Sequence, residues 1–126
     1  MAACSEAPRP PALVLGLFED DYGSQYTITD TLWSQGTEAR YRVIAWHPDA
    51  QYVVAVNDTA NPGDGGRFTR IDWMPLGGMP PWGWAYCYSA YNAPTAAAAE
   101  STTVANRATP RTGCNGFPFS RMRPAP

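Results

Sequence analysis

The sequence predicts a mainly β protein: an antiparallel meander or small barrel of five to seven strands, with one C-terminal α-helix and a disulfide-pinned tail. Three observations predict this class. Segments in which apolar and polar residues alternate with period two follow one another between residues 16 and 91. A single alanine-rich segment comes after them, and two cysteines, Cys87 and Cys114, flank that segment.

The first predicted strands lie before residue 34. A short apolar run at 13–18 ends in an acidic turn. Residues 25–33 then alternate, with Tyr26, Ile28 and Leu32 on one face and threonines on the other, which indicates a half-buried strand. We expect the turn after it at 34–37.

The clearest hairpin joins residues 40–46 to 51–57 through His47-Pro48-Asp49-Ala50, where the proline fixes φ for a turn. A polar, glycine-rich loop precedes a strand at 67–74. Prolines and glycines exclude a ladder at 75–81, and 82–91 is the last strong strand.

The chemistry of the chain changes at Pro94. Residues 95–100 are good helix formers, Asn92 or Thr95 can cap them, and we expect the helix to end near Asn106.

A closed barrel would remove exposed strand edges, and a half-barrel covered by the helix is the alternative. We expect a disordered Pro-rich tether at 1–12, a single domain at 13–122 and a disordered tail at 123–126.

The composition excludes some classes of function. The net charge is −2 and arginine supplies all nine positive charges, so the chain lacks the basic stripe of a nucleic-acid binder. The absence of lysine and the abundance of Ala, Pro and Gly are typical of a bacterial protein from a GC-rich genome. The longest apolar run, at 12–18, is too short to span a membrane, and the sequence shows no full signal peptide.

The three cysteines indicate an oxidising compartment. We pair Cys87 with Cys114, because both flank the predicted helix and closing a loop of this length would stabilise the fold by roughly 3–4 kcal/mol. Cys4 stays unpaired. Ala2-Ala3-Cys4-Ser5 resembles the end of a bacterial lipobox, which makes Cys4 a candidate lipidation site, although an alanine-rich chain also produces this motif by chance. We expect the periplasm, the outer-membrane surface or the extracellular space.

The segment 16–29, Gly-Leu-Phe-Glu-Asp-Asp-Tyr-Gly-Ser-Gln-Tyr-Thr-Ile-Thr, resembles the opening of calycin-type barrels, the lipocalin and avidin-like proteins. These families begin with Gly-x-aromatic, a polar connection, Gly-Ser and an alternating strand. Lipocalins also often carry a helix after the barrel and a disulfide that ties back the tail. The resemblance implies a barrel rather than a sandwich, and an avidin-like site would use Ser24. Phe18 replaces the usual tryptophan, and the helix and disulfide depart from avidin.

An aromatic strand is the main candidate site. Trp82, Trp84, Tyr86 and Tyr88 fall on one face by period two, and Trp46 can join them. The pattern allows three interpretations of this face: it is buried core, it lines a pocket, or it is an exposed platform for a sugar or a partner. We take these five residues as candidate ligand-binding residues.

No other group of residues carries a convincing site. His47 lies in a turn without a nucleophile motif, and the carboxylates at 19–21 are consecutive turn residues. The loop 58–66 has oxygen ligands but lacks the EF-hand spacing, and the cysteines and histidine are too far apart for zinc. We predict no catalytic residue, metal or cofactor.

The preferred function is a non-catalytic binding module of the cell envelope or the extracellular space, with a small apolar or glycan ligand. We expect a monomer, and a lipid anchor is its one candidate means of membrane attachment. A structural or protein-interaction lipoprotein without a small ligand is the first alternative, favoured by a filled interior. A small hydrolase is the second, favoured by a cluster of His47, a carboxylate and a hydroxyl in a cleft.

Overall fold

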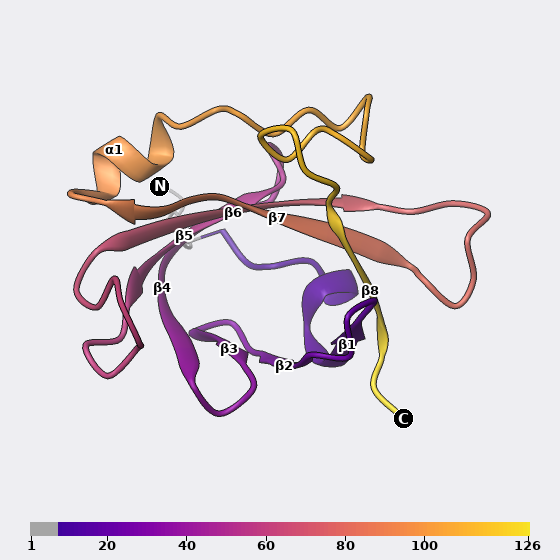
Figure 1. Ribbon diagram of the computed structural model, residues 1–126, viewed down its shortest axis with the longest axis horizontal. Helices are drawn as coiled ribbons and strands as arrows, with labels where there is room; N and C mark the ends of the chain where they lie inside the picture. The colour runs from indigo at the N-terminus through magenta and orange to yellow at the C-terminus, as the bar shows by residue number, and fades with distance from the viewer. Residues whose placement is uncertain (1–7) are drawn as a thin grey trace, which may run out of the picture.

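The computed structural model describes residues 8–126 and shows a closed antiparallel barrel of eight strands, each hydrogen-bonded to its neighbours in chain order (Figure 1). The predicted Cys4 site lies outside the described residues. The elements are η1 (Ala12–Val14), β1 (Gly16–Asp20), β2 (Gln25–Ile28), β3 (Leu32–Gln35), β4 (Ala39–His47), β5 (Tyr52–Asn57), β6 (Phe68–Pro75), β7 (Trp84–Ala93), α1 (Ala96–Glu100) and β8 (Ser120–Pro124).

The predicted β class is confirmed, and the barrel is compatible with a calycin-like fold. The prediction of five to seven strands was too low for two reasons. The segment at 25–33 is two strands, because the chain turns at Thr29–Thr31, where the Thr29 hydroxyl accepts a hydrogen bond from Leu32 N. The last strand, β8, lies in a part of the chain where we expected no strand, and it includes Arg123 and Pro124 of the tail that we expected to be disordered.

Strand β8 closes the barrel. It pairs with β7 on one side, where Trp84 faces Met122, and with β1 on the other, where Glu19 faces Arg123. A half-barrel is therefore excluded. The outward side chains of β8 form ion pairs across the contact between β8 and β1, Arg121 with Asp21 and Arg123 with Glu19.

The predicted helix is real but shorter than expected. Thr95 caps α1 by accepting a hydrogen bond from Ala98 N, and the helix ends at Glu100 rather than near Asn106. The Ser101 and Thr102 hydroxyls both bond the carbonyl of Ala98, and β-branched residues follow, so the sequence stops favouring helix at this point. Neither helical segment in residues 8–126 has the length and hydropathy that crossing a membrane requires.

The Cys87–Cys114 disulfide is confirmed, with 5.6 Å between the two Cα atoms. It fixes the segment 101–119 against the outer face of β7, and Figure 1 shows this segment and α1 running above β6 and β7. Because disulfides persist in oxidising environments, the bond points to a non-cytoplasmic compartment.

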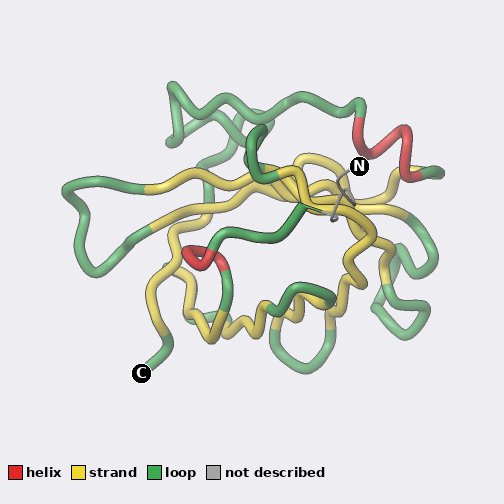
Figure 2. The backbone as a smooth tube through the Cα atoms, turned by 180° about the vertical axis from the view of Figure 1, so that it is seen from behind, coloured by secondary structure: helices red, strands yellow, loops and turns green. Residues whose placement is uncertain are grey.

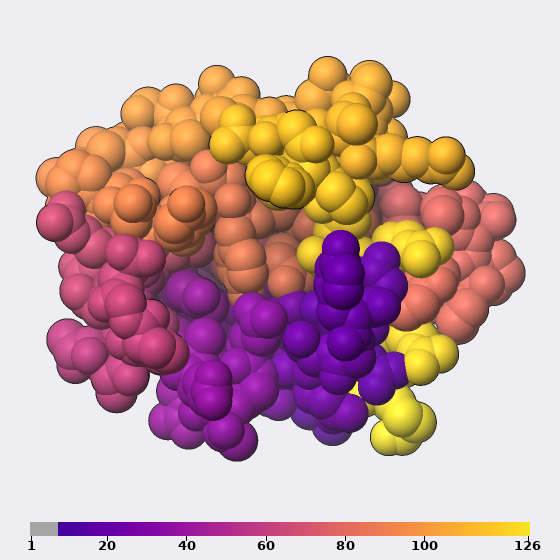
Figure 3. All heavy atoms as spheres, viewed as in Figure 1, coloured from indigo at the N-terminus to yellow at the C-terminus, as the bar shows by residue number. Residues whose placement is uncertain are grey.

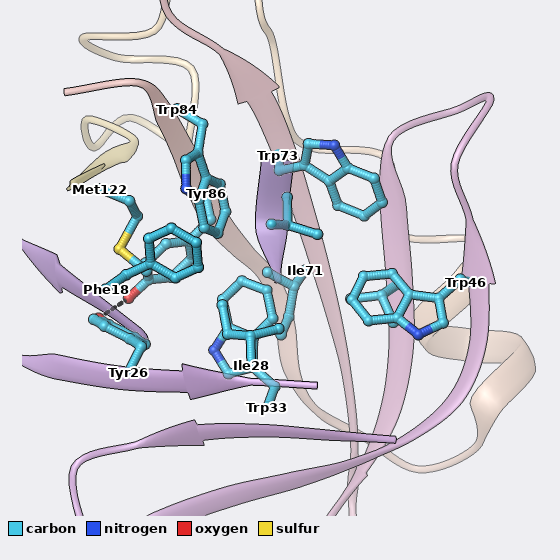
Figure 4. Close-up of a cluster of buried hydrophobic side chains, with 12 residues drawn as sticks. Phe18, Tyr26, Ile28, Trp33, Trp46, Ile71, Trp73, Trp84, Tyr86 and Met122 are labelled. Atoms are coloured by element: carbon cyan, nitrogen blue, oxygen red, sulfur yellow. Dashed lines mark hydrogen bonds between the residues drawn. The ribbon is translucent and has the colours of Figure 1, made fainter. Parts of the chain in front are cut away.

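Packed side chains fill the barrel interior. The core contains Val14, Phe18, Tyr26, Ile28, Trp33, Trp46, Val53, Ile71, Trp73, Trp84, Tyr86 and Met122. Trp33 is fully buried and meets Tyr26, Trp84 and Tyr86 with ring centroids 5.4–6.4 Å apart in edge-to-face contacts (Figure 4). In the view from behind, the segment that carries η1 runs across one opening of the barrel (Figure 2), and Val14 of η1 is buried in the core.

Candidate functional site

The five aromatic residues singled out from the sequence do not share one environment. Trp84, Tyr86 and Trp46 are core residues, 2%, 4% and 5% exposed. Trp46 reaches the core because a bulge at Ile44 reverses the alternation of β4, so that Tyr41, Val43 and Trp46 all pack on the interior. There it lies 5.7 Å from Trp73.

Trp82 departs from the predicted pattern. The strand begins at Trp84 rather than at residue 82, so period two does not extend to Trp82. Instead, the guanidinium groups of Arg121 and Arg123 lie 5.0 and 5.3 Å from its ring centroid. Trp82 therefore belongs to the outer surface beside β8, and the prediction that it shares a face with Trp84 was wrong.

Tyr86 belongs to a hydrogen-bonded chain inside the barrel. The Tyr26 hydroxyl donates to the Asp20 carboxylate at 2.7 Å, so its oxygen is free to accept the proton of the Tyr86 hydroxyl. Asp20 also accepts hydrogen bonds from the backbone N–H groups of Tyr22 and Ser24. The buried carboxylate thus fixes the β1–β2 turn and anchors two core tyrosines.

Burial controls the protonation of the interior tyrosines. Removal of the hydroxyls from water raises the pKa of Tyr26, Tyr86 and Tyr88 well above the ordinary value of 10.0. The same cause raises the pKa of Tyr41. These four groups therefore stay neutral in the folded protein at pH values where an unfolded chain begins to ionise.

We expect the free energy of unfolding to fall steeply above about pH 10. Below the pKa of tyrosine in the unfolded chain, both states keep their phenolic protons, and the free energy of unfolding does not depend on these groups' titration. Above that pKa, the unfolded state loses protons that the folded state retains, and the free energy of unfolding falls. Each strongly shifted tyrosine contributes a slope of up to about 1.4 kcal/mol per pH unit. The chain has no lysine, so tyrosines dominate the titration in this range.

Urea denaturation at pH 9, 10 and 11, with tyrosinate absorbance measured in parallel, checks this expectation. Tyr26→Phe should make the pH dependence shallower. A free energy of unfolding that stays constant between pH 9 and 11 would contradict it.

Tyr88 lies where the packed core gives way to a hollow of about 290 Å³, here called the mouth hollow. Its hydroxyl donates to Gln35 Oε1 at 2.8 Å and accepts from the Trp33 indole at 3.3 Å. Figure 3 shows this end of the molecule, with a recess between the purple atoms of β3 and β4 and the orange atoms of β7. The hollow is lined by Ala39, Tyr41, Asn57, Asn61, Pro62, Asp64, Tyr88 and Tyr91.

The β5–β6 loop forms one wall of the mouth hollow and is held in place by two asparagines. Asn61 bonds both backbone groups of Arg40, at 2.8 Å each. Asn57 donates to the carbonyls of Asp64 and Tyr91. Asn57 thus bonds the Asp64 backbone, whereas the Asp64 carboxylate has no hydrogen bond or ion pair among residues 8–126. Tyr91 is 56% exposed.

Three residues of the mouth hollow, Tyr41, Tyr91 and Asp64, were not among the candidates predicted from the sequence. The alternation of the predicted hairpin already placed Tyr41 on the same face as Val43, which is a usable signal for an inward position. Nothing in the local pattern indicated that the loop at 58–66 folds beside β7. That arrangement depends on the long-range hydrogen bond from Asn57 to Tyr91.

A second group of charged residues, around Asp72, serves the fold. Asp72 is fully buried on the outer face of β6, where it bonds Arg70, Arg107 and the Ser89 hydroxyl. We call these four residues the Asp72 network. Arg107 also donates to the carbonyls of Gln51 and Trp73, so the network fastens the segment 101–119 to the barrel.

His47 ends β4 and stacks on Tyr52 with ring centroids 4.3 Å apart. Its Nε2 lies 3.7 Å from the Glu100 carboxylate, which also accepts the Tyr52 hydroxyl. Among the described residues, no serine or cysteine side chain forms a hydrogen bond with His47, Tyr52 or the Glu100 carboxylate. Within residues 8–126, no three His, Cys, Asp or Glu side chains are placed to hold a metal ion.

Comparisons with known proteins give no further assignment: no protein-family model, curated protein or solved structure matches this chain.

Proposed function

We propose that this protein is a non-catalytic binding domain that takes a glycan in the mouth hollow. The observation that carries the proposal is the combination of rings and a carboxylate at the end of the barrel where core packing stops. Tyr41, Tyr88 and Tyr91 line the hollow together with Asp64, whose carboxylate makes no hydrogen bond to residues 8–126.

The chemistry of the lining favours a sugar over a purely apolar ligand. Tyrosine rings offer flat apolar surface to the C–H face of a sugar, and their hydroxyls offer hydrogen bonds. The Asp64 carboxylate accepts hydrogen bonds from ligand hydroxyls. None of the lining residues is an arginine, so the hollow suits a neutral ligand better than an anion.

The size of the hollow limits the ligand. Small-molecule pockets usually measure about 300–1,000 Å³, so the hollow, at about 290 Å³, is slightly smaller than this range. A single sugar unit fits this space better than a longer chain. A terminal sugar can therefore sit in the hollow while the rest of the glycan extends into solvent.

The setting that we propose is the periplasm, the outer-membrane surface or the extracellular space, with Cys4 as a lipid anchor. The disulfide supports the compartment. A structural or protein-interaction lipoprotein without a small ligand is the second candidate, and the filled barrel interior favours it.

Saturation-transfer NMR with a panel of neutral methyl glycosides and N-acetylhexosaminides tests the proposal. At least one glycoside should bind saturably, and Tyr91→Ala and Asp64→Asn should each weaken binding about fivefold or more, because each removes a contact from the hollow. Tyr22→Ala is the matched control, since Tyr22 is 76% exposed and does not line the hollow.

Two results would overturn the glycan proposal. The first is a panel in which no glycoside receives saturation from the folded protein. The second is a bound glycoside whose affinity falls as much in Tyr22→Ala as in Tyr91→Ala. Either result leaves the structural or protein-interaction lipoprotein as the better candidate.

A further inference from the structure

A second hollow lies on the side of the barrel, between the β6–β7 loop and the segment held by the disulfide. It encloses about 450 Å³, and we call it the side groove. None of its lining residues belongs to the mouth hollow. The side groove is lined by Asp21, Leu76, Met79, Ala85, Pro110, Arg111, Pro118, Phe119 and Arg121.

The floor of the side groove is apolar. Ala85 and Phe119 are 1% and 4% exposed and belong to a small core on the outer face of β7 that also contains Leu76. Met79 extends this surface toward solvent and is 39% exposed. An aliphatic chain that lies along these side chains is removed from water, which favours binding. The small core beneath them keeps this apolar surface in place.

The rim of the side groove carries one excess positive charge. Arg121 is paired with Asp21, Nε to Oδ2 at 3.0 Å, so these two charges largely compensate each other. Arg111 is exposed and has no ion pair or side-chain hydrogen bond within residues 8–126. Its guanidinium is therefore available to an anion that enters the groove.

Both walls of the side groove are fixed. On one side, the Cys87–Cys114 disulfide and a 2.8 Å hydrogen bond from Phe119 N to the Pro110 carbonyl hold the segment that contains Arg111. On the other, Leu76 N bonds the Gly83 carbonyl at 2.9 Å across the β6–β7 loop. Little ordering entropy is then lost when a ligand binds.

We propose that the side groove binds an anionic amphiphile, with the aliphatic tail on Leu76, Met79 and Phe119 and the acidic head on Arg111. The apolar floor selects the tail, and the unpaired guanidinium selects a negative head over a neutral or positive one. A free fatty acid and the acidic head of a membrane lipid share this chemistry. The inference is independent of the glycan proposal, because the two sites share no residue.

Methionine-methyl NMR with sodium dodecanoate below its micelle concentration tests the proposal. The Met79 methyl signal should shift saturably, whereas that of Met122, which is fully buried in the barrel core, should not. Dodecyltrimethylammonium has the same tail and a positive head, and it should shift Met79 much less. Arg111→Gln should weaken dodecanoate binding about fivefold or more.

Arg67→Gln is the matched control. Arg67 is also an exposed arginine, but it precedes β6 whereas Leu76 follows it, and it does not line the side groove. Dodecanoate affinity should be the same in this variant as in the unmodified protein. Equal affinity for the two dodecyl compounds, an unchanged affinity in Arg111→Gln, or an unshifted Met79 signal would each overturn the proposal.

Sedimentation with phosphatidylglycerol vesicles distinguishes the two sources of the amphiphile. Binding of dodecanoate without binding to vesicles supports a free amphiphile as the ligand. Binding to vesicles that Arg111→Gln reduces and Arg67→Gln does not supports a membrane lipid. Vesicle binding that is equal in both variants would exclude the side groove as the site of lipid contact.

Discussion

Trp84→Ala is expected to lower the free energy of unfolding by about 3–5 kcal/mol, since the substitution removes a large aromatic ring from a packed core. Trp84 is 2% exposed, and its ring centroid lies 5.1 Å from that of Phe18 and 6.0 Å from that of Trp33. Urea denaturation of the oxidised protein measures the change. A correctly folded Trp84→Ala variant of unchanged stability would contradict the assignment of this residue to the core.

Two further substitutions separate the causes of this loss. Trp82→Ala removes the same side chain two residues earlier, but from the outer surface, and should cost about 1 kcal/mol or less. Trp84→Phe should cost less than Trp84→Ala, because it keeps an aromatic ring. It also removes the indole Nε1, a buried group without a hydrogen-bond partner among the described residues.

Asp72→Asn is expected to destabilise the protein by about 3–5 kcal/mol, because it leaves the charge of a buried arginine without its counterion. Asp72 is fully buried, and Arg70, which it holds through hydrogen bonds of 3.0 and 3.1 Å, is 7% exposed. The loss should appear in urea denaturation. Faster amide hydrogen exchange in the segment 101–119 should accompany it, since Arg107 fastens that segment through the same carboxylate.

Arg42→Gln is the control for the Asp72 substitution. Arg42 forms a surface pair with Asp58 at 3.8 Å, and its side chain is 71% exposed. Solvent screens such a pair, so its removal should change stability by less than about 1 kcal/mol. If Asp72→Asn cost no more than Arg42→Gln, the Asp72 network would not be what holds the segment 101–119 in place.

The local pattern predicted the β class, the hairpin of β4 and β5 and the Cys87–Cys114 pair, because alternation, turn residues and cysteine positions are visible in short windows. It could not predict the bulge at Ile44, which turns Trp46 inward, since a bulge depends on pairing with the neighbouring strand. Strand β8 lacked a signal for the same reason. Pro118 precedes it and Pro124 is its last residue, so the local sequence disfavours a strand, and pairing with β1 and β7 makes it one.

The candidate sites depend even more on long-range contacts. Period two placed Trp84, Tyr86 and Tyr88 on one face, and the structure divides that face between a packed core and the margin of the mouth hollow. The opposing strands determine where along this face of β7 the core packing ends. The position of Asp64 follows from a loop anchored to β4 and β7. The side groove forms because the disulfide and Arg107 hold residues 101–119 against the barrel, beside the β6–β7 loop.

The pairing of β1 with β8 has a consequence for how the chain acquires its structure. This pairing joins residues 18–20 to residues 122–124, the largest sequence separation of any strand pair in the barrel. Folds dominated by such contacts form slowly, because the loop-closure entropy is lost before the contacts are gained. Until β8 emerges from the ribosome or a translocation channel, the edges of β1 and β7 stay unpaired and open to association with other chains. Barrel closure therefore requires β8, and a chaperone that shields the edges of β1 and β7 would act before closure.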